Sequence, residues 1–266
     1  ATRARAAQRP LVDRVCESAG EAVSQADLVI FCVPPGAMGA AAAPLAEAIP
    51  ADALISDVGS CKQSIAKALG EALPRHTIIP AHPVAGTEHS GPDAGFASLF
   101  RNRWCIITPP EGADPEKVAA LGRFWKALGA NVETMDAGHH DLVLAVTSHL
   151  PHLIAYTIVG TASDLEDVTQ SEVIKYSAGG FRDFTRIAAS DPVMWRDVFL
   201  ANKEAVLTML QRFTEDLTAL QRAIRTGKGD VLLEHFAHTR AIRRSIIEEG
   251  QDDARPDFGR GDHGNT

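Results

Sequence analysis

The sequence has no surplus of positive charge, which argues against nucleic acid as a partner. Its 266 residues include 26 Lys and Arg against 34 Asp and Glu, which gives a formal net charge of −8. Proteins that bind phosphate backbones carry basic stripes or patches, and this sequence has none. We therefore expect no nucleic-acid partner.

Cysteine pairs and long apolar runs are missing too. Cys16, Cys32, Cys61 and Cys105 are scattered through apolar runs without CxxC spacing, which predicts buried, reduced thiols. We find no apolar run of the roughly 18 residues that span a membrane, and the Arg-rich N-terminus lacks the apolar centre of a signal peptide. The sequence therefore predicts a soluble, cytoplasmic protein with no membrane partner.

The first half of the chain alternates short apolar runs with helical stretches. Hydrophobic residues make up 45% of the sequence, which is enough to build a core. Unbroken apolar runs bounded by Gly, Pro or Asp are typical of parallel strands covered on both faces. We expect strands at 27–33, 53–57, 77–81, 104–108 and 131–134, with helices around 37–49, 62–72 and 115–128. This order predicts a doubly wound α/β dinucleotide-binding (Rossmann-like) domain over residues 1–136.

Helical periodicity replaces the strand pattern after about residue 136. It predicts an all-α domain over residues 137–249, with a long helical segment from Pro192 to about Arg225. Apolar residues recur there three, four or seven positions apart and form one stripe, made of Trp195, Phe199, Val206, Leu210, Phe213, Leu217 and Leu220. Such a stripe is either ordinary helix core or a dimer face. Residues 250–266 are polar, and we expect a disordered tail.

His82 follows the strand expected at 77–81 and precedes a turn rich in Gly and Pro. The carboxyl end of a strand is where an α/β sheet holds its ligand, and an imidazole there can exchange protons near neutral pH. A single histidine at a strand end caps a turn about as often, so this interpretation needs partner residues.

Two further loops leave the same edge of the expected sheet. Val33, Pro34 and Pro35 end one strand, and Gly59 and Ser60 follow the next. We expect both loops to face the crevice in which a dinucleotide would lie, with backbone N–H groups and the Ser60 hydroxyl near a ribose or a reacting group. Gly-Ser after a strand is also common turn chemistry.

The helical half carries two polar segments. In Ser148-His-Leu-Pro-His152 the histidines are three apart and share a helix face. A metal site would need further ligands at suitable spacing, and we expect no metal. Farther on, two glycines precede Arg182 and Arg186. An arginine beside a closely approachable backbone suits a carboxylate ligand, although a surface salt bridge explains it equally well.

Together these segments resemble the prephenate and arogenate dehydrogenase family. The resemblance runs from about Leu11 to about Glu249, and its motifs come in the same order. They are Leu11-Val-Asp13, Val33-Pro34, Asp57-Val-Gly-Ser60-Cys-Lys62, His82-Pro-Val-Ala-Gly-Thr-Glu88, Ser148-His-Leu-Pro-His152 and Gly180-Phe-Arg-Asp-Phe-Thr-Arg186 through Trp195. The resemblance implies that the helical second domain forms a homodimer.

The resemblance also implies residue roles. His82 is the implied catalytic acid/base, and Ser60 hydrogen-bonds near it. The implied substrate pocket includes Ser148, His152, Arg186, Glu88 and Trp195, with Glu88 at its mouth and Trp195 in its wall.

The implied reaction belongs to tyrosine biosynthesis and uses NAD or NADP. A cyclohexadiene substrate loses a hydride from C4 and its C1 carboxylate as CO2, and the aromatic ring that results supplies the driving force. The protein has to align C4 with the nicotinamide, take the hydroxyl proton through His82 and hold two carboxylates, one of them with Arg186.

The start of the chain departs from the family. The family opens with a strand and a GxGxxG turn that receives the pyrophosphate at a helix N-terminus, whereas residues 1–9 match the helix after the second strand of such a fold. We expect roughly 30 to 40 residues before Ala1, the size of one βαβ opening, and these would decide between NAD and NADP. Without them the run 27–33 would be an edge strand.

Two alternatives stay open on the residues alone. One is a hydroxy-acid dehydrogenase of related fold that acts on another carboxylate substrate. The other is a noncatalytic binding protein that has lost its nucleotide loop. The joint presence of His82, Ser60, His152 and Arg186 argues against the second, because a decayed site should not keep its polar groups.

Overall fold

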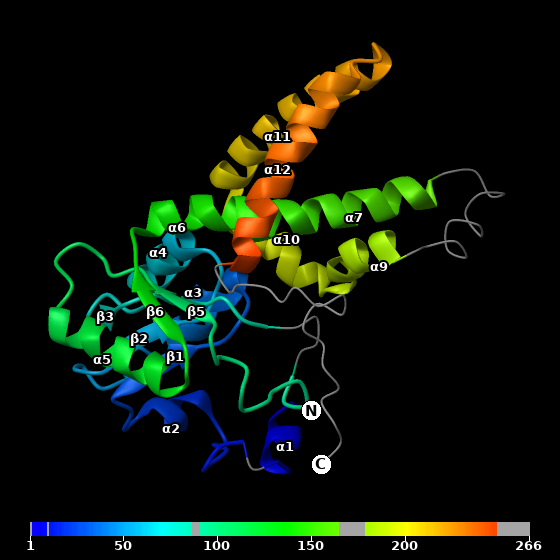
Figure 1. Ribbon diagram of the computed structural model, residues 1–266. Helices are drawn as coiled ribbons and strands as arrows, with labels where there is room; N and C mark the ends of the chain where they lie inside the picture. The colour runs from blue at the N-terminus through cyan, green and yellow to red at the C-terminus, as the bar shows by residue number, and fades with distance from the viewer. Residues whose placement is uncertain (1, 10, 87–90, 165–178, 249–266) are drawn as a thin grey trace. The chain divides into compact units, whose positions relative to one another are not determined.

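Six short strands among the described residues form the centre of the α/β half of the chain (Figure 1). The structure, a computed structural model, describes residues 2–9, 11–86, 91–164 and 179–248. The expected alternation of strands and helices is present. Strands β1 (Leu28–Phe31), β2 (Leu54–Asp57) and β3 (Thr77–Ile78) pair in that order, all parallel. Strands β4 (Ala81–Pro83), β5 (Trp104–Ile107) and β6 (Asn131–Thr134) also pair in that order, with β4 antiparallel to β5 and β6 parallel to it.

Pro80 divides the strand expected at 77–81 into β3 and β4. Proline has no N–H group to continue a ladder of hydrogen bonds. The carbonyl oxygen of Pro80 accepts a hydrogen bond from Thr108 N at 2.9 Å. Before Pro80, β3 pairs with β2, and after it β4 pairs with β5. His82 therefore lies within β4, opposite Ile106, and not after the end of a strand as the sequence suggested.

Helices cover both faces of the strands, which explains the unbroken apolar runs. Ile55 of β2 packs in one core with Ile65 and Leu69. The neighbouring Leu54 points to the opposite face and packs in a second core that includes Trp125, as alternation along a strand requires.

The helices of this half agree with expectation in two cases out of three. Helix α4 (Lys62–Ala72) and helix α5 (Pro115–Ala127) lie where they were expected. The stretch 37–49 instead holds three short pieces, because Pro44 cannot donate to the helical ladder. These are η1 (Pro35–Ala37), α3 (Met38–Ala42) and η2 (Ala43–Leu45), and two short helices, α1 (Thr2–Ala7) and α2 (Ala19–Val23), precede β1.

The described residues of the second half form helices joined by short connections. One continuous helical path consists of α6 (Ala137–Leu144), the π-helical turn η3 (Ala145–His149) and α7 (Leu150–Ser163). It is followed by α9 (Gly179–Thr185), η4 (Arg186–Ala189), α10 (Pro192–Ala201), α11 (Lys203–Arg225) and α12 (Gly229–Glu248). The chain divides into two compact units, Ala1–Met209 and Leu210–Thr266. The expected tail at 250–266 lies outside the described residues.

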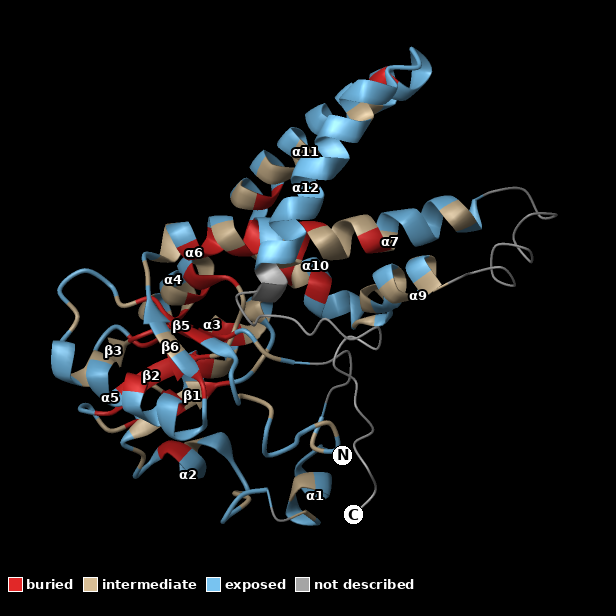
Figure 2. Ribbon diagram, in the orientation of Figure 1, coloured by how far each residue is buried: buried red, intermediate tan, exposed pale blue. Residues whose placement is uncertain are grey.

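The long segment expected from Pro192 is two helices separated at Asn202, whose side chain is used for hydrogen bonds elsewhere. The burial of the apolar stripe decreases along these two helices. Trp195 and Val206 are buried, whereas the side chain of Leu217 is 53% exposed. Figure 2 shows α11 and α12 mostly in the colour of exposed residues. The stripe is therefore core at its beginning and surface farther along.

The expectation that no segment reaches membrane-spanning length is wrong. Ala137–Ser163 is 27 residues long and contains an 18-residue window with a mean hydropathy of 1.6, so by length and composition alone it could span a membrane. Core helices of soluble proteins have the same properties. His140, Asp141 and His149 of this segment are buried and hydrogen-bonded to other parts of the fold, which favours a core helix.

The cysteines depart in part from expectation. All four are free thiols, but only Cys61 and Cys105 are buried, whereas Cys16 is half-buried and Cys32 is exposed. Cys32 lies directly after the end of β1 (Leu28–Phe31).

Candidate active site

His82 is held in β4 by a chain of hydrogen bonds that ends at a carboxylate. Its Nδ1 lies 2.9 Å from Nε2 of His140, and Nδ1 of His140 lies 2.9 Å from Oδ1 of Asp141. The His82 and His140 rings meet edge to face, with their centroids 5.1 Å apart. All three side chains are buried.

The same Asp141 carboxylate caps helix α4. Its Oδ1 accepts from Lys62 N at 2.7 Å, and its Oδ2 accepts from Gln63 N at 3.0 Å. The first N–H groups of a helix have no partner within the helix, and the helix dipole favours a negative charge there. Asp141 therefore ties α6 to the start of α4, beside the strand that carries His82.

A buried ion pair lies behind His82. Lys62 Nζ is 2.5 Å from Asp57 Oδ2 and 2.6 Å from the carbonyl oxygen of Ala81, the residue before His82. Burial raises the pKa of Asp57 and lowers that of Lys62, and in each case the partner's charge opposes the shift. Such a pair is costly to break because removing one partner leaves a buried charge uncompensated.

The pKa of His82 lies well below its ordinary value. Burial is the main cause, and the neighbouring His140, Lys62 and His149 lower the pKa further. The imidazole is therefore neutral at physiological pH and able to accept a proton.

His149 is the last residue of the π-helical turn η3. π-helical turns are frequently found at functional sites. The Nδ2 amide of Asn202 donates to Nδ1 of His149 at 3.1 Å and to the carbonyl oxygen of Asp141 at 2.8 Å. Burial lowers the pKa of His149 to about 4. Asn202 thus joins His149 to the segment that holds His82 in place.

His152 and Trp195 stack on one another, and Arg186 lies close enough to affect the pKa of the His152 imidazole. Nδ1 of His152 lies 2.9 Å from the carbonyl oxygen of Ser148, and its ring centroid is 3.6 Å from that of Trp195. Burial lowers the pKa of His152, and the positive charge of Arg186 lowers it further. Tyr156 donates to the carbonyl oxygen of Ser190 at 2.8 Å, which holds the segment after Arg186 against α7.

The two loops expected to face a dinucleotide leave neighbouring strand ends. Phe31 of β1 is in register with Asp57 of β2, so the segments 33–35 and 59–60 emerge side by side at the carboxyl edge of the sheet. A Cβ at Gly59 would lie 2.3 Å from Ile65 Cδ1, so a side chain there would require the buried Ile65 to move. The Gly59 N–H donates to Asp57 Oδ2 at 2.8 Å. This edge is the place where α/β sheets bind nucleotides, so the residues fit a nicotinamide cofactor.

Comparison with known proteins shows the family of this chain. Residues 1–134 match the nucleotide-binding domain of prephenate dehydrogenase, and residues 136–238 match its dimerization domain. The chain belongs to the prephenate dehydrogenase family.

Three individual proteins show how near these relatives are. Cyclohexadienyl dehydrogenase of Zymomonas mobilis is 46% identical over 244 residues, which cover 92% of this chain and 83% of that protein. The crystal structure of A. aeolicus prephenate dehydrogenase with hydroxyphenyl propionate and NAD+ has a TM-score of 0.85 and 32% identity, over 91% of this chain and 85% of that one. Synechocystis arogenate dehydrogenase has a TM-score of 0.77 and 26% identity, over 92% and 87% of the two chains.

The structure brings three of the residues expected from the family together, namely His152, Trp195 and Arg186. The polar network described above links the surroundings of His82 with those of His149, and His149 faces the same indole as His152, with ring centroids of His149 and Trp195 6.1 Å apart. Ser60 has its hydroxyl 3.9 Å from Sγ of Cys61, and its expected role beside His82 stays a prediction. Glu88 lies outside the described residues.

Sequence reasoning missed the residues that support His82. His140, Asp141 and Asn202 carry no motif signal of their own, although Asp141 precedes an apolar run and His140 is adjacent to it. Their roles depend on contacts 58 to 79 residues apart in sequence. Only the folded arrangement reveals such contacts.

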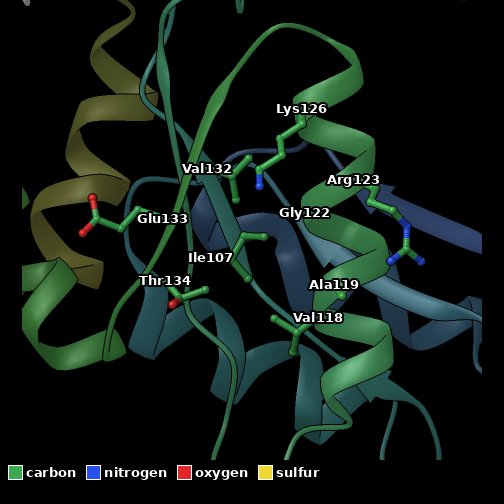
Figure 3. Close-up of a pocket in the computed structure, with 9 residues that line it drawn as sticks. All are labelled: Ile107, Val118, Ala119, Gly122, Arg123, Lys126, Val132, Glu133 and Thr134. Carbon is green, nitrogen blue, oxygen red and sulfur yellow. The ribbon is translucent and has the colours of Figure 1, made fainter.

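Within the described ranges, no group of three or more His, Cys, Asp and Glu side chains is arranged to hold a metal ion. A separate groove lies between α5 and β6, with Arg123 and Lys126 on the helix and Glu133 and Thr134 on the strand (Figure 3). It contains none of the residues expected at the active site, and we assign it no function.

Proposed function

We propose that this chain oxidises and decarboxylates prephenate, arogenate or both, with NAD or NADP, in tyrosine biosynthesis. The observation that carries the proposal is the buried, neutral imidazole of His82. It lies in a family fold whose relatives are prephenate, cyclohexadienyl and arogenate dehydrogenases. A hydroxy-acid dehydrogenase of another specificity and a noncatalytic binding protein are not favoured by these relatives.

His82 is the proposed general base. A bound nicotinamide would supply the acceptor for the hydride from C4 of the substrate. The C4 hydroxyl has to lose its proton at the same stage, and a neutral imidazole is the group that accepts it. Ser60 is proposed to hydrogen-bond near His82. Proton abstraction by a positioned base contributes typically 10² to 10⁴ in rate.

The substrate's carboxylates are proposed to be held from the helical half. Arg186 is the proposed carboxylate clamp, since a guanidinium offers two parallel N–H donors. Ser148 and His152 are proposed as further substrate contacts and Trp195 as the wall of the pocket, which their shared position with Arg186 supports. The expected role of Glu88 at the mouth of the pocket stays a prediction. Holding both ends of the substrate aligns C4 for reaction.

The dinucleotide is proposed to lie across the carboxyl edge of β1 and β2. Val33, Pro34, Pro35, Gly59 and Ser60 would contact it, and the closeness of the two loops supports this.

We propose further that the protein is cytoplasmic and homodimeric, without nucleic-acid, membrane or metal partners. The match of residues 136–238 to a dimerization domain supports the dimer. We also propose that residues 1–136 form the dinucleotide-binding domain and residues 137–249 the helical domain. The family matches to residues 1–134 and 136–238 support this boundary.

The test is a matrix of steady-state assays with two substrates and two cofactors. Reduced nicotinamide is followed by its absorbance after addition of prephenate or arogenate, each with NAD or NADP. We expect turnover in at least one combination, with 4-hydroxyphenylpyruvate or tyrosine formed in equal amount. No turnover with any combination, in a protein that is folded by circular dichroism and binds a dinucleotide, would contradict the proposal.

A further inference from the structure

The chain of hydrogen bonds from His82 through His140 ends at the Asp141 carboxylate, and this carboxylate determines which atoms donate and which accept. The Asp141 carboxylate can only accept hydrogen bonds, so the Nδ1 of His140 that faces it at 2.9 Å must be the donor. A neutral imidazole with its hydrogen on Nδ1 has a lone pair on Nε2. That lone pair faces Nδ1 of His82 at 2.9 Å.

The tautomer of His140 determines the tautomer of His82. Because Nε2 of His140 accepts, Nδ1 of His82 has to donate, and the hydrogen of the neutral His82 ring is then fixed on Nδ1. Its second nitrogen, Nε2, keeps the lone pair. In the opposite tautomer, Nδ1 of His82 would present a lone pair to the lone pair of His140, and Nε2 would carry a hydrogen and could accept nothing.

We propose that His140 and Asp141 are positioning residues that set the tautomer of His82, with the hydrogen on Nδ1 and the accepting lone pair on Nε2. The inference rests on the proposed function, in which His82 takes the hydroxyl proton. It adds the atom that takes the proton and the two residues that make it available.

Two further features of the site support this arrangement. Asp141 is kept as an acceptor because both its oxygens take backbone N–H groups from the start of α4 at 2.7 and 3.0 Å. A carboxylate that is held in this way cannot rotate to offer a different geometry to His140. When His82 takes a proton, its Nδ1–H donates more strongly to the same acceptor, since charge-assisted hydrogen bonds are the stronger kind. The arrangement therefore serves both protonation states of His82.

The first test observes the tautomer directly and needs no turnover. Full-length protein labelled with ¹⁵N at histidine is studied by NMR above neutral pH, and the His82 signals are identified by their loss in His82→Asn. We expect a protonated, pyrrole-type Nδ1 and an unprotonated, pyridine-type Nε2. The reverse pattern would overturn the proposal, and it would do so whether or not the protein turns over prephenate.

The second test compares substitutions at one position. His140→Gln keeps both contacts, because its amide N–H can donate to Asp141 while its oxygen accepts from His82. His140→Leu removes both. We expect His140→Leu to lower kcat about 10- to 100-fold with KM changed less than about threefold, and His140→Gln to recover most of the loss. The exposed neighbour His139→Leu is the matched control and should behave as wild type.

The outcomes separate the possible roles. If His140→Leu and His140→Gln lose kcat equally, His140 has a packing role and the proposal is wrong. Should His140→Leu fail to fold, the tautomer of His82 in the wild-type and His140→Gln proteins still decides the question, since the proposal requires a pyridine-type Nε2 in both. Absence of turnover in the wild-type protein with the expected tautomer would contradict the proposed function and leave the tautomer assignment standing.

Discussion

The imidazole of His152 lies against the indole of Trp195, with ring centroids 3.6 Å apart and an angle of 23° between the ring planes. The two residues come from α7 and α10, and the stack joins two helices that the sequence gives no reason to pair. Trp195 is 6% exposed and also packs with Cys61 and Val198. Its flat face is therefore a fixed surface that orients His152.

Trp195→Leu should raise KM for the substrate in a protein that still folds. Loss of the stack frees the His152 ring, and we expect KM for the substrate to rise about tenfold, in line with aromatic pair energies of about 0.5–1.5 kcal/mol. Trp125→Leu is the control, since Trp125 is buried in the α5 core. That variant should lose thermal stability and keep its KM. Equal KM values for the two variants would show that the stack has no part in binding.

Arg186→Ala should weaken substrate binding with a smaller effect on turnover. A carboxylate clamp stabilises the ground state and the transition state alike, so we expect KM to rise at least about tenfold while kcat changes less. Arg212→Ala is a matched control because Arg212 is exposed on α11 and pairs with Asp216 of the same helix. An unchanged KM in Arg186→Ala would make Arg186 a surface or structural residue.

Stability should fall as the pH is lowered through the range where buried His149 resists protonation. Its pKa is about 4 in the folded protein against 6.5 ordinarily. The unfolded chain binds a proton between these values and the folded chain does not, so the contribution is complete above about pH 6.5 and lost towards pH 4. The slope is about 1.4 kcal/mol per pH unit for each such histidine. Urea unfolding from pH 4 to 8 measures it.

Substitution of His149 provides the comparison for this pH dependence. His149→Gln should reduce the slope by about one histidine's share, while His235→Gln, at an exposed position on α12, should leave it unchanged. A slope that is the same in all three proteins would mean that His149 is not the group responsible.

A dimer should form through exposed apolar side chains in the unit Leu210–Thr266. Leu233 and Phe236 of α12 are 69% and 55% exposed and lie three residues apart on one face. We expect light scattering at micromolar concentration to give twice the mass of the single chain, as determined for the same sample by mass spectrometry. Leu233→Glu should weaken the dimer at least about tenfold, and His238→Glu should not. A monomeric wild-type protein would contradict the dimer.

The sequence predicts the α/β half well because each element is local. The runs at 53–57 and 131–134 and the helix at 62–72 carry their own periodicity and end at Gly, Pro or Asp, and the structure places them within one residue of expectation. The sequence predicts a strand that includes Pro80, because the neighbours of Pro80 are apolar. The break there depends on Thr108, which lies far along the chain.

The candidate site was predictable only where motifs name residues. His82, His152 and Arg186 stand in recognisable segments, and the structure places His152 and Arg186 together. His140 and Asn202 look like ordinary helix positions in the sequence. Their roles come from burial and from hydrogen bonds between distant segments, and local periodicity carries no information on either.

The most direct test of the account is the turnover of His82→Asn, measured in the same assay as the wild-type protein with its preferred substrate and cofactor. Asparagine is close to histidine in size and polarity but cannot accept a proton from the C4 hydroxyl. We predict a fall in kcat of at least about 100-fold, with KM within a few-fold of wild type. A variant with near-normal kcat would contradict the assignment of His82 as the base, and with it the central claim.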